Sequence, residues 1–183
     1  MKFIHYFNLI YIVEGSIIKK TGALLIINGL NRYFDPNGED YLGVDSGKTI
    51  KYISDKLILA RTTNIPVFFI NDHKYSSATS QKEFFDNSVL EQLTPLENEE
   101  IIFKEHPSAF FQSWLETKLK ELGVTEVVVT GTHTNLAVFF TAVDAKRKGF
   151  RVIIDEKCIL TDSQITQAMF IKEMKETHGI EVF

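Results

Sequence analysis

Four polar groups directly follow short apolar runs in this chain, at positions where they could meet and perform acid–base or nucleophilic chemistry. Asn28 follows the run Ala23–Ile27, and Asp72 follows a second apolar run. Lys104 ends a third run, and the turn Gly131–Thr134 comes directly after a fourth. An ammonium group can hold an anion or lower the pKa of a nucleophile, and a turn that opens a helix can offer N–H groups to an oxyanion.

The apolar runs themselves predict the elements that must position these groups. They are short, rich in Val, Ile and Phe, and nearly continuous in apolarity, which is typical of strands buried on both faces of a parallel sheet. Longer segments with helical spacing alternate with them, so we predict an α/β fold. We expect a doubly wound, mainly parallel six-stranded sheet with helices on both faces and right-handed crossovers. The expected strands cover residues 23–27, 66–71, 100–103, 126–130, 151–155 and 180–183.

Because ligands bind at the carboxyl ends of strands in such folds, the four polar groups are expected at one pocket. Two predicted helices border it. Residues 111–122 have apolar side chains at helical spacing, with Phe111 on the buried side and Gly123 as a C-terminal cap. Residues 134–148 are apolar almost all round until their last cations, which predicts a buried helix with Thr134 as its N-cap.

Composition narrows the class of protein. With 183 residues, 44% hydrophobic content and a net charge of −4, the chain is expected to form one globular domain over residues 23–183. Its lysines and arginines are scattered, which disfavours nucleic acid or an anionic membrane as a partner. The single cysteine, Cys158, excludes an internal disulfide and fits a reducing, cytoplasmic setting.

The first 22 residues are treated as an N-terminal extension. Their apolar run, residues 3–13, is too short to span a membrane as a helix. Residues 1–22 are therefore expected to form an extra strand or the contact of a homo-oligomer.

Two motifs resemble those of the isochorismatase-like cysteine hydrolase superfamily, which includes nicotinamidases and related amidohydrolases. The first is Lys104–Phe110, with its Ser-Ala-Phe ending, and the second is Gly131–Thr134 followed by Thr141–Ala145. The resemblance extends from about Ala23 to the C-terminus. It implies a Rossmann-like three-layer sandwich and a catalytic triad. In that triad an aspartate follows the first strand, a lysine precedes the Ser-Ala-Phe, and a cysteine opens the next helix.

At the three triad positions this sequence has Asn28, Lys104 and Ala137. Alanine has no nucleophile, and an asparagine amide cannot serve as a base at neutral pH. Isochorismatases proper have a small residue at the cysteine position and protonate a vinyl ether with the aspartate, so Ala137 fits that branch while Asn28 removes its acid. Cys158 follows a later strand and is not expected to replace the nucleophile. Both chemistries are therefore expected to be lost, with Lys104 alone retained.

Metal-binding members of the superfamily have an Asp-x-His after the second strand. Here Asp72 is followed by His73 and Lys74, which puts lysine at the position of the ligand histidine. An ammonium group would repel a divalent cation. We therefore predict no metal and no other cofactor.

The resemblance also implies a set of substrate-binding positions around the triad. They are Phe34, Asp72, His106, Gly131, Thr132, His133 and Thr134. Two further residues could replace the lost acid. Asp35 is one, although an Asp-Pro pair also starts turns, and His133 is the other, although it could simply face solvent.

Three functions follow from these residues. We favour a family member that has lost catalysis and keeps a pocket for a small molecule. Burial of an ammonium group without a partner costs several kcal/mol of folding free energy, so Lys104 must be neutralised, solvated or paired. We therefore expect the pocket to prefer small carboxylates. The alternative is an active hydrolase of a C–N, ester or vinyl-ether bond, with a rearranged site around Lys104 and His133. The third is a structural role in a homo-oligomer.

Overall fold

The computed structural model describes residues 10–13, 16–19, 21–72 and 79–183, and the side chains among them from residue 22 onward. His73 and Lys74 therefore lie outside the described residues, as do residues 1–9 of the extension. None of the described helices has the length and apolarity needed to cross a lipid bilayer.

The main sheet is parallel and has the strand order β5-β4-β3-β6-β7-β9, with β8 paired to β6. All six predicted strands are confirmed, and β8 is a seventh strand whose two residues are too few to give a periodic signal. The strands are β3 (Thr21–Ile27), β4 (Val67–Asp72), β5 (Glu100–Lys104), β6 (Val124–Thr132), β7 (Arg151–Ile154), β8 (Ile159–Leu160) and β9 (Glu181–Val182).

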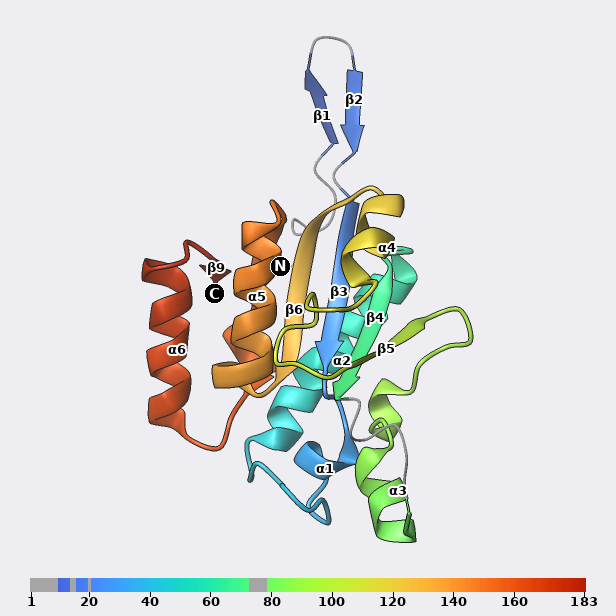
Figure 1. Ribbon diagram of the computed structural model, residues 1–183, viewed down its shortest axis with the longest axis vertical. Coiled ribbons are helices and arrows are strands. Elements are labelled where there is room, and N and C mark those ends of the chain that lie inside the picture. Colours follow the sequence, from blue (N-terminus) through green and yellow to red (C-terminus); the bar gives the residue numbers. More distant parts are fainter. Residues whose placement is uncertain (1–9, 14–15, 20, 73–78) are drawn as a thin grey trace.

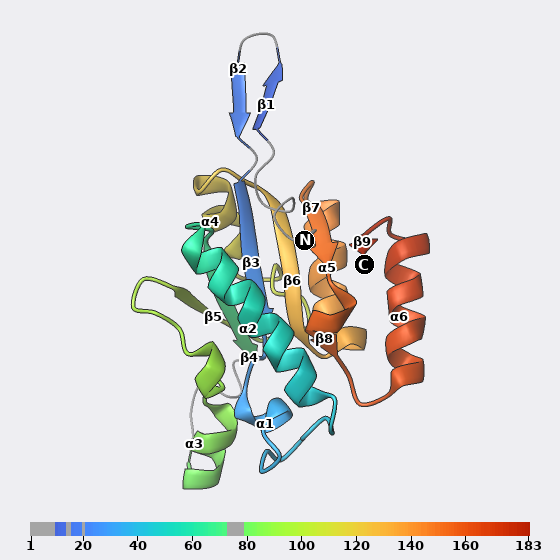
Figure 2. The ribbon, with the colours of Figure 1, turned by 180° about the vertical axis from the view of Figure 1, so that it is seen from behind.

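Helices cover both faces of this sheet, as predicted. α4, α5 and α6 lie on one face (Figure 1), and α2 crosses the other face over β3 and β4 (Figure 2). Two apolar cores result, because successive residues of a strand point to opposite faces: Leu25 and Ile27 belong to one core, Leu24 and Ile26 to the other. The helices are α1 (Asn31–Phe34), α2 (Ser46–Thr62), α3 (Gln81–Asn87), α4 (Leu115–Glu121), α5 (Phe139–Arg147) and α6 (Gln164–Glu176).

The helix predicted over residues 111–122 is shorter than its apolar spacing indicates. It begins only at Leu115, and Phe111 is 50% exposed instead of buried. The preceding segment is held by side chains: Ala109 N–H donates to Thr141 Oγ1 at 3.0 Å, and Phe110 N–H donates to Ser108 Oγ at 3.2 Å. These bonds satisfy backbone groups outside a helix, which favours a turn over another helical turn.

The buried helix predicted over residues 134–148 also differs at its start. Residues Thr134–Val138 form a π-helical turn, η3, and the α-helix begins at Phe139. The residue at the N-cap is His133, and its side chain makes no capping hydrogen bond, so Thr134 is not the N-cap. A single turn of five residues is too short for its apolar spacing to distinguish a π-helical from an α-helical turn.

The described part of the N-terminal extension is a hairpin. β1 (Ile10–Val13) pairs antiparallel with β2 (Ser16–Lys19), and the two form a sheet of their own. The hairpin lies beyond the start of β3 (Figure 1). A role for it in oligomerisation stays a prediction.

Candidate functional site

The carboxyl ends of β3, β4 and β5 bring three polar side chains together. In the parallel register Ile27 lies beside Ile70, and Asp72 lies beside Lys104. Asn28 is the first residue after β3, and its N–H donates to the Ile70 carbonyl at 2.8 Å. Its φ is +49°, in the left-handed region that asparagine tolerates better than most residues.

These side chains form a closed hydrogen-bonded group. Asn28 Nδ2 donates to Asp72 Oδ2 at 2.9 Å, and the Asp72 backbone N–H donates to Asn28 Oδ1 at 3.1 Å. Lys104 Nζ forms an ion pair with Asp72 Oδ1 and also donates to the His106 carbonyl at 3.2 Å. Lys104 is 3% exposed, so this pairing supplies the partner that its buried charge requires. Of the three outcomes expected for Lys104, the structure has the paired one.

The fourth strand end belongs to β6, which pairs with β3. Gly131 has a φ of +109°, and a Cβ there would lie 1.9 Å from the Ile27 carbonyl oxygen, so only glycine permits this approach of β6 to β3. Thr132 donates its hydroxyl to the Leu160 carbonyl at 3.0 Å, which holds β8 against β6. The Thr132–His133 peptide bond is cis. Ala137, which the resemblance assigns to the nucleophile position, lies in η3.

A cavity of about 490 Å³, open to solvent, lies at these strand ends. The His133 ring meets the Tyr33 ring edge-on, with centroids 4.8 Å apart, and His106 Nε2 lies 3.2 Å from Gln112 Oε1. None of the described residues that line it has a thiol or an aliphatic hydroxyl. They are Asn28, Tyr33, Asp72, Lys104, Glu105, His106, Pro107, His133, Leu136 and Ala137.

Most of the predicted site residues meet in this cavity. The lining includes all three triad positions together with Asp72, His106 and His133. Gly131, Thr132 and Thr134, also predicted to bind substrate, are not among the lining residues: Gly131 and Thr132 end β6, and Thr134 begins η3. Phe34 is different: it packs in the core on the α2 side, and its neighbour Tyr33 lines the cavity instead.

Sequence reasoning missed four lining residues: Tyr33, Glu105, Pro107 and Leu136. Each is next in sequence to a predicted position, and adjacency is the only signal the sequence offered for them. The single turn of α1 decides between Tyr33 and Phe34, since consecutive helical residues point about 100° apart.

Two substitute groups considered from the sequence do not reach the cavity. The Asp35 carboxylate accepts hydrogen bonds from Asn37 N–H at 2.8 Å and from Asn37 Nδ2 at 3.0 Å, so it closes a turn. Cys158 is buried in the core on the α2 side, and burial raises the pKa of its thiol to about 12. A neutral, buried thiol outside the cavity is no nucleophile for this site.

The described residues around Asp72 do not fit a metal. The two carboxylate oxygens already accept hydrogen bonds from Asn28 and from the Lys104 ammonium, which would repel a cation. The described part of the chain also contains no group of three His, Cys, Asp or Glu side chains that could hold a metal ion.

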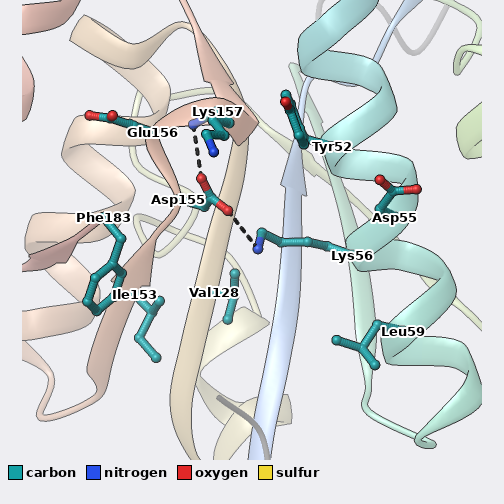
Figure 3. Close-up of a pocket in the computed structure, with 10 residues that line it drawn as sticks. All are labelled: Tyr52, Asp55, Lys56, Leu59, Val128, Ile153, Asp155, Glu156, Lys157 and Phe183. Carbon is teal, nitrogen blue, oxygen red and sulfur yellow. Dashed lines mark hydrogen bonds and ion pairs between the residues drawn. The ribbon is translucent and has the colours of Figure 1, made fainter. Parts of the chain in front are cut away.

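A second cavity, also of about 490 Å³, lies between α2 and β7 (Figure 3). Its floor includes Val128 and Ile153, which lie within strands and not at their ends. Asp155 pairs with two groups there: Lys56 Nζ lies 2.9 Å from Asp155 Oδ2, and Asp155 Oδ1 accepts from Lys157 N–H at 3.1 Å (Figure 3). No residue predicted for the site lines it, so the first cavity is the candidate site.

Comparison with known proteins identifies the family of this chain. The model of the isochorismatase domain matches residues 22–182. The chain belongs to the isochorismatase family. This match covers every strand of the main sheet, except for Thr21 at the start of β3, and all four strand ends of the site.

Individual relatives agree with this assignment. The chain is 29% identical over 152 residues to the uncharacterized isochorismatase family protein YaaI of Bacillus subtilis, covering 79% of this chain and 83% of the relative. It is 36% identical over 153 residues to maleamate amidohydrolase of Pseudomonas putida, covering 75% and 71%. The crystal structure of nicotinamidase PncA from Bacillus subtilis superposes with a TM-score of 0.78 at 23% identity, covering 88% of this chain and 98% of that one. This last likeness supports the fold alone.

Proposed function

We propose that this isochorismatase family protein has lost nucleophilic hydrolysis and uses the strand-end cavity to bind a small molecule, with carboxylates as the preferred class. The observation that supports the loss most directly is the chemistry of the lining, in which Ala137 and Asn28 occupy the nucleophile and acid positions. Without a thiolate or a free carboxylate facing Lys104, neither covalent catalysis nor protonation by residue 28 can proceed.

The rearranged hydrolase is less well supported by the geometry. His133 does line the cavity, but the described lining offers no thiol or aliphatic hydroxyl for it to activate as a nucleophile. Asp35, the other substitute, closes its own turn. The Lys104 ammonium forms an ion pair with Asp72, so it is not available to activate a thiol or a water.

Preference for carboxylates follows from the donors in the wall. Lys104 Nζ and Asn28 Nδ2 point at the same carboxylate, that of Asp72, and hold one oxygen each. Charge-assisted hydrogen bonds of this kind are about twice as strong as neutral ones. The same two donors therefore suit the carboxylate of a ligand.

Calorimetry with a small aromatic carboxylate tests the binding. We expect benzoate to bind the wild-type protein and its neutral isostere benzamide to bind at least about tenfold more weakly, because an ammonium favours the charged group. Lys104→Met keeps most of the apolar stem and should abolish that preference. Equal benzoate affinity in the wild type and Lys104→Met would refute the proposed function.

A gain-of-function variant tests the loss of catalysis. The triple variant Asn28→Asp, Asp72→Asn, Ala137→Cys places a carboxylate, the lysine and a thiol at the three triad positions. We expect it to hydrolyse small amides such as nicotinamide or maleamate, measured by ammonia release, while the wild type shows no turnover above background. The matched control is the double variant without Ala137→Cys, which should be inactive. Turnover by the wild type at the level of the triple variant would contradict the proposed loss.

A further inference from the structure

Asp72 is the one carboxylate in the cavity that both buried donors address. Its Oδ2 accepts from Asn28 and its Oδ1 from Lys104, so neither oxygen faces the cavity without a partner. Asn28 is 1% exposed and the Lys104 side chain is also 1% exposed, whereas the Asp72 side chain is 23% exposed. The two donors are therefore fixed in the wall, and the Asp72 side chain is the member of the group that solvent or a ligand meets.

The amide of Asn28 is suited to a carboxylate at residue 72. An amide at position 28 presents an N–H to the Asp72 side chain and an oxygen to the Asp72 backbone N–H, and the structure uses both. An ionised carboxylate at position 28 could accept the backbone N–H but could not donate to Asp72. The aspartate that ends β4 thus supplies the negative charge beside Lys104, whereas the resemblance implies an acid directly after β3.

A ligand carboxylate and Asp72 require the same donors. Lys104 is too deeply buried to hold its charge without an anion beside it, so whichever carboxylate leaves must be replaced by another. Addition of a second anion beside Asp72 would bring two carboxylates to one ammonium, which is unfavourable. Exchange avoids this, since the number of charges around Lys104 stays the same.

We propose that Asp72 is an internal carboxylate that occupies the anion position of the pocket, and that small carboxylates bind by displacing it from Lys104 and Asn28. This inference rests on the proposed function and adds a mechanism of competition to it. The apparent affinity of the wild type for a carboxylate is then lowered, because only molecules in which Asp72 has released the two donors can bind it.

The isosteric variant Asp72→Asn removes the competitor and keeps the size of the side chain. We expect Asp72→Asn to bind benzoate at least about tenfold more tightly than the wild type, with benzamide affinity changed less than about twofold. A control is Lys104→Met combined with Asp72→Asn, which should lose the gain. If Asp72→Asn binds benzoate no better than the wild type while Lys104→Met weakens it, the exchange is refuted and the proposed function stands. If no protein binds benzoate, both are refuted.

A second measurement uses the wild-type protein and does not depend on the stability of a variant. Protein labelled with ¹³C at the aspartate side-chain carboxyl carbons gives a resonance for Asp72, assigned by its absence in Asp72→Asn or by its proximity to Lys104. We expect this resonance to shift when benzoate saturates the pocket and to stay in place with benzamide. A bound benzoate that leaves the Asp72 resonance unmoved would show addition, and would overturn the exchange.

Discussion

At the scale of single residues, the site differs from the triad that the resemblance implies in the carboxylate that pairs with Lys104. Lys104 keeps its place at the end of β5, but the carboxylate beside it is that of Asp72, and Asn28 holds this carboxylate. The sequence predicted that Lys104 needed compensation and that Asp72 lined the pocket. It could not predict that one satisfies the other, because that depends on side-chain rotamers on neighbouring strands.

Asn28 and Asp72 act as a matched pair, so changing one should be costly unless the other changes too. Asn28→Asp replaces a 2.9 Å hydrogen bond with two adjacent carboxylates. We expect a loss of about 1–3 kcal/mol in the free energy of unfolding at pH 7, measured by urea denaturation. The loss should shrink as the pH falls, because a protonated carboxyl can donate to its neighbour.

The reciprocal double variant Asn28→Asp, Asp72→Asn restores one amide and one carboxylate. Its stability should return to within about 1 kcal/mol of the wild type, which gives the pair a measurable coupling energy. Additive costs for the two substitutions would show that the residues do not interact.

At the scale of elements, the six strands and the placement of the site at their carboxyl ends follow from apolar runs and from the rule for parallel sheets. Helix starts were predicted less well. The late beginning of α4 depends on Thr141 accepting a hydrogen bond from the distant Ala109, which no local pattern reports. Phe34 and Tyr33 could not be distinguished, because a one-turn helix has no periodicity to read.

Close packing of β3 against β6 gives a test at this scale. Gly131→Ala would put a Cβ 1.9 Å from the Ile27 carbonyl oxygen, in a backbone conformation that alanine disfavours. We expect a loss of about 3 kcal/mol or more in the free energy of unfolding, measured by urea denaturation. Gly149→Ala is the matched control: its φ is also positive, at +89°, but nothing lies within 4 Å of the added Cβ. It should cost about 1 kcal/mol. Equal costs would mean that the backbone relaxes around residue 131.

At the scale of the whole molecule, the hairpin β1–β2 is set apart from the main sheet, and the family match begins at residue 22. A two-stranded hairpin alone is at best marginally stable in water, and its edges can pair with other strands. These properties are consistent with the proposed role of residues 1–22 in a homo-oligomer.

Deleting residues 1–20 tests that role. We expect light scattering to give a multiple of the chain mass for the full-length protein and a single chain mass for the shortened one. The thermal unfolding midpoints of the two proteins are then compared at a concentration low enough for the full-length protein to be monomeric. They should match, because the main sheet keeps all its strands. The same mass for both proteins would contradict the role of the extension.

The left-handed backbone at residue 28 has a consequence for how such a protein can change over generations. A φ of +49° is adopted with little strain by asparagine, aspartate and glycine, and it is strained for most other residues. Aspartate and asparagine codons differ at a single nucleotide, so replacement of Asn28 by an acid needs only one mutation. The hydrogen bond to Asp72 opposes that replacement, because an acid at residue 28 would meet another acid. We expect it to be tolerated only together with a compensating change at residue 72.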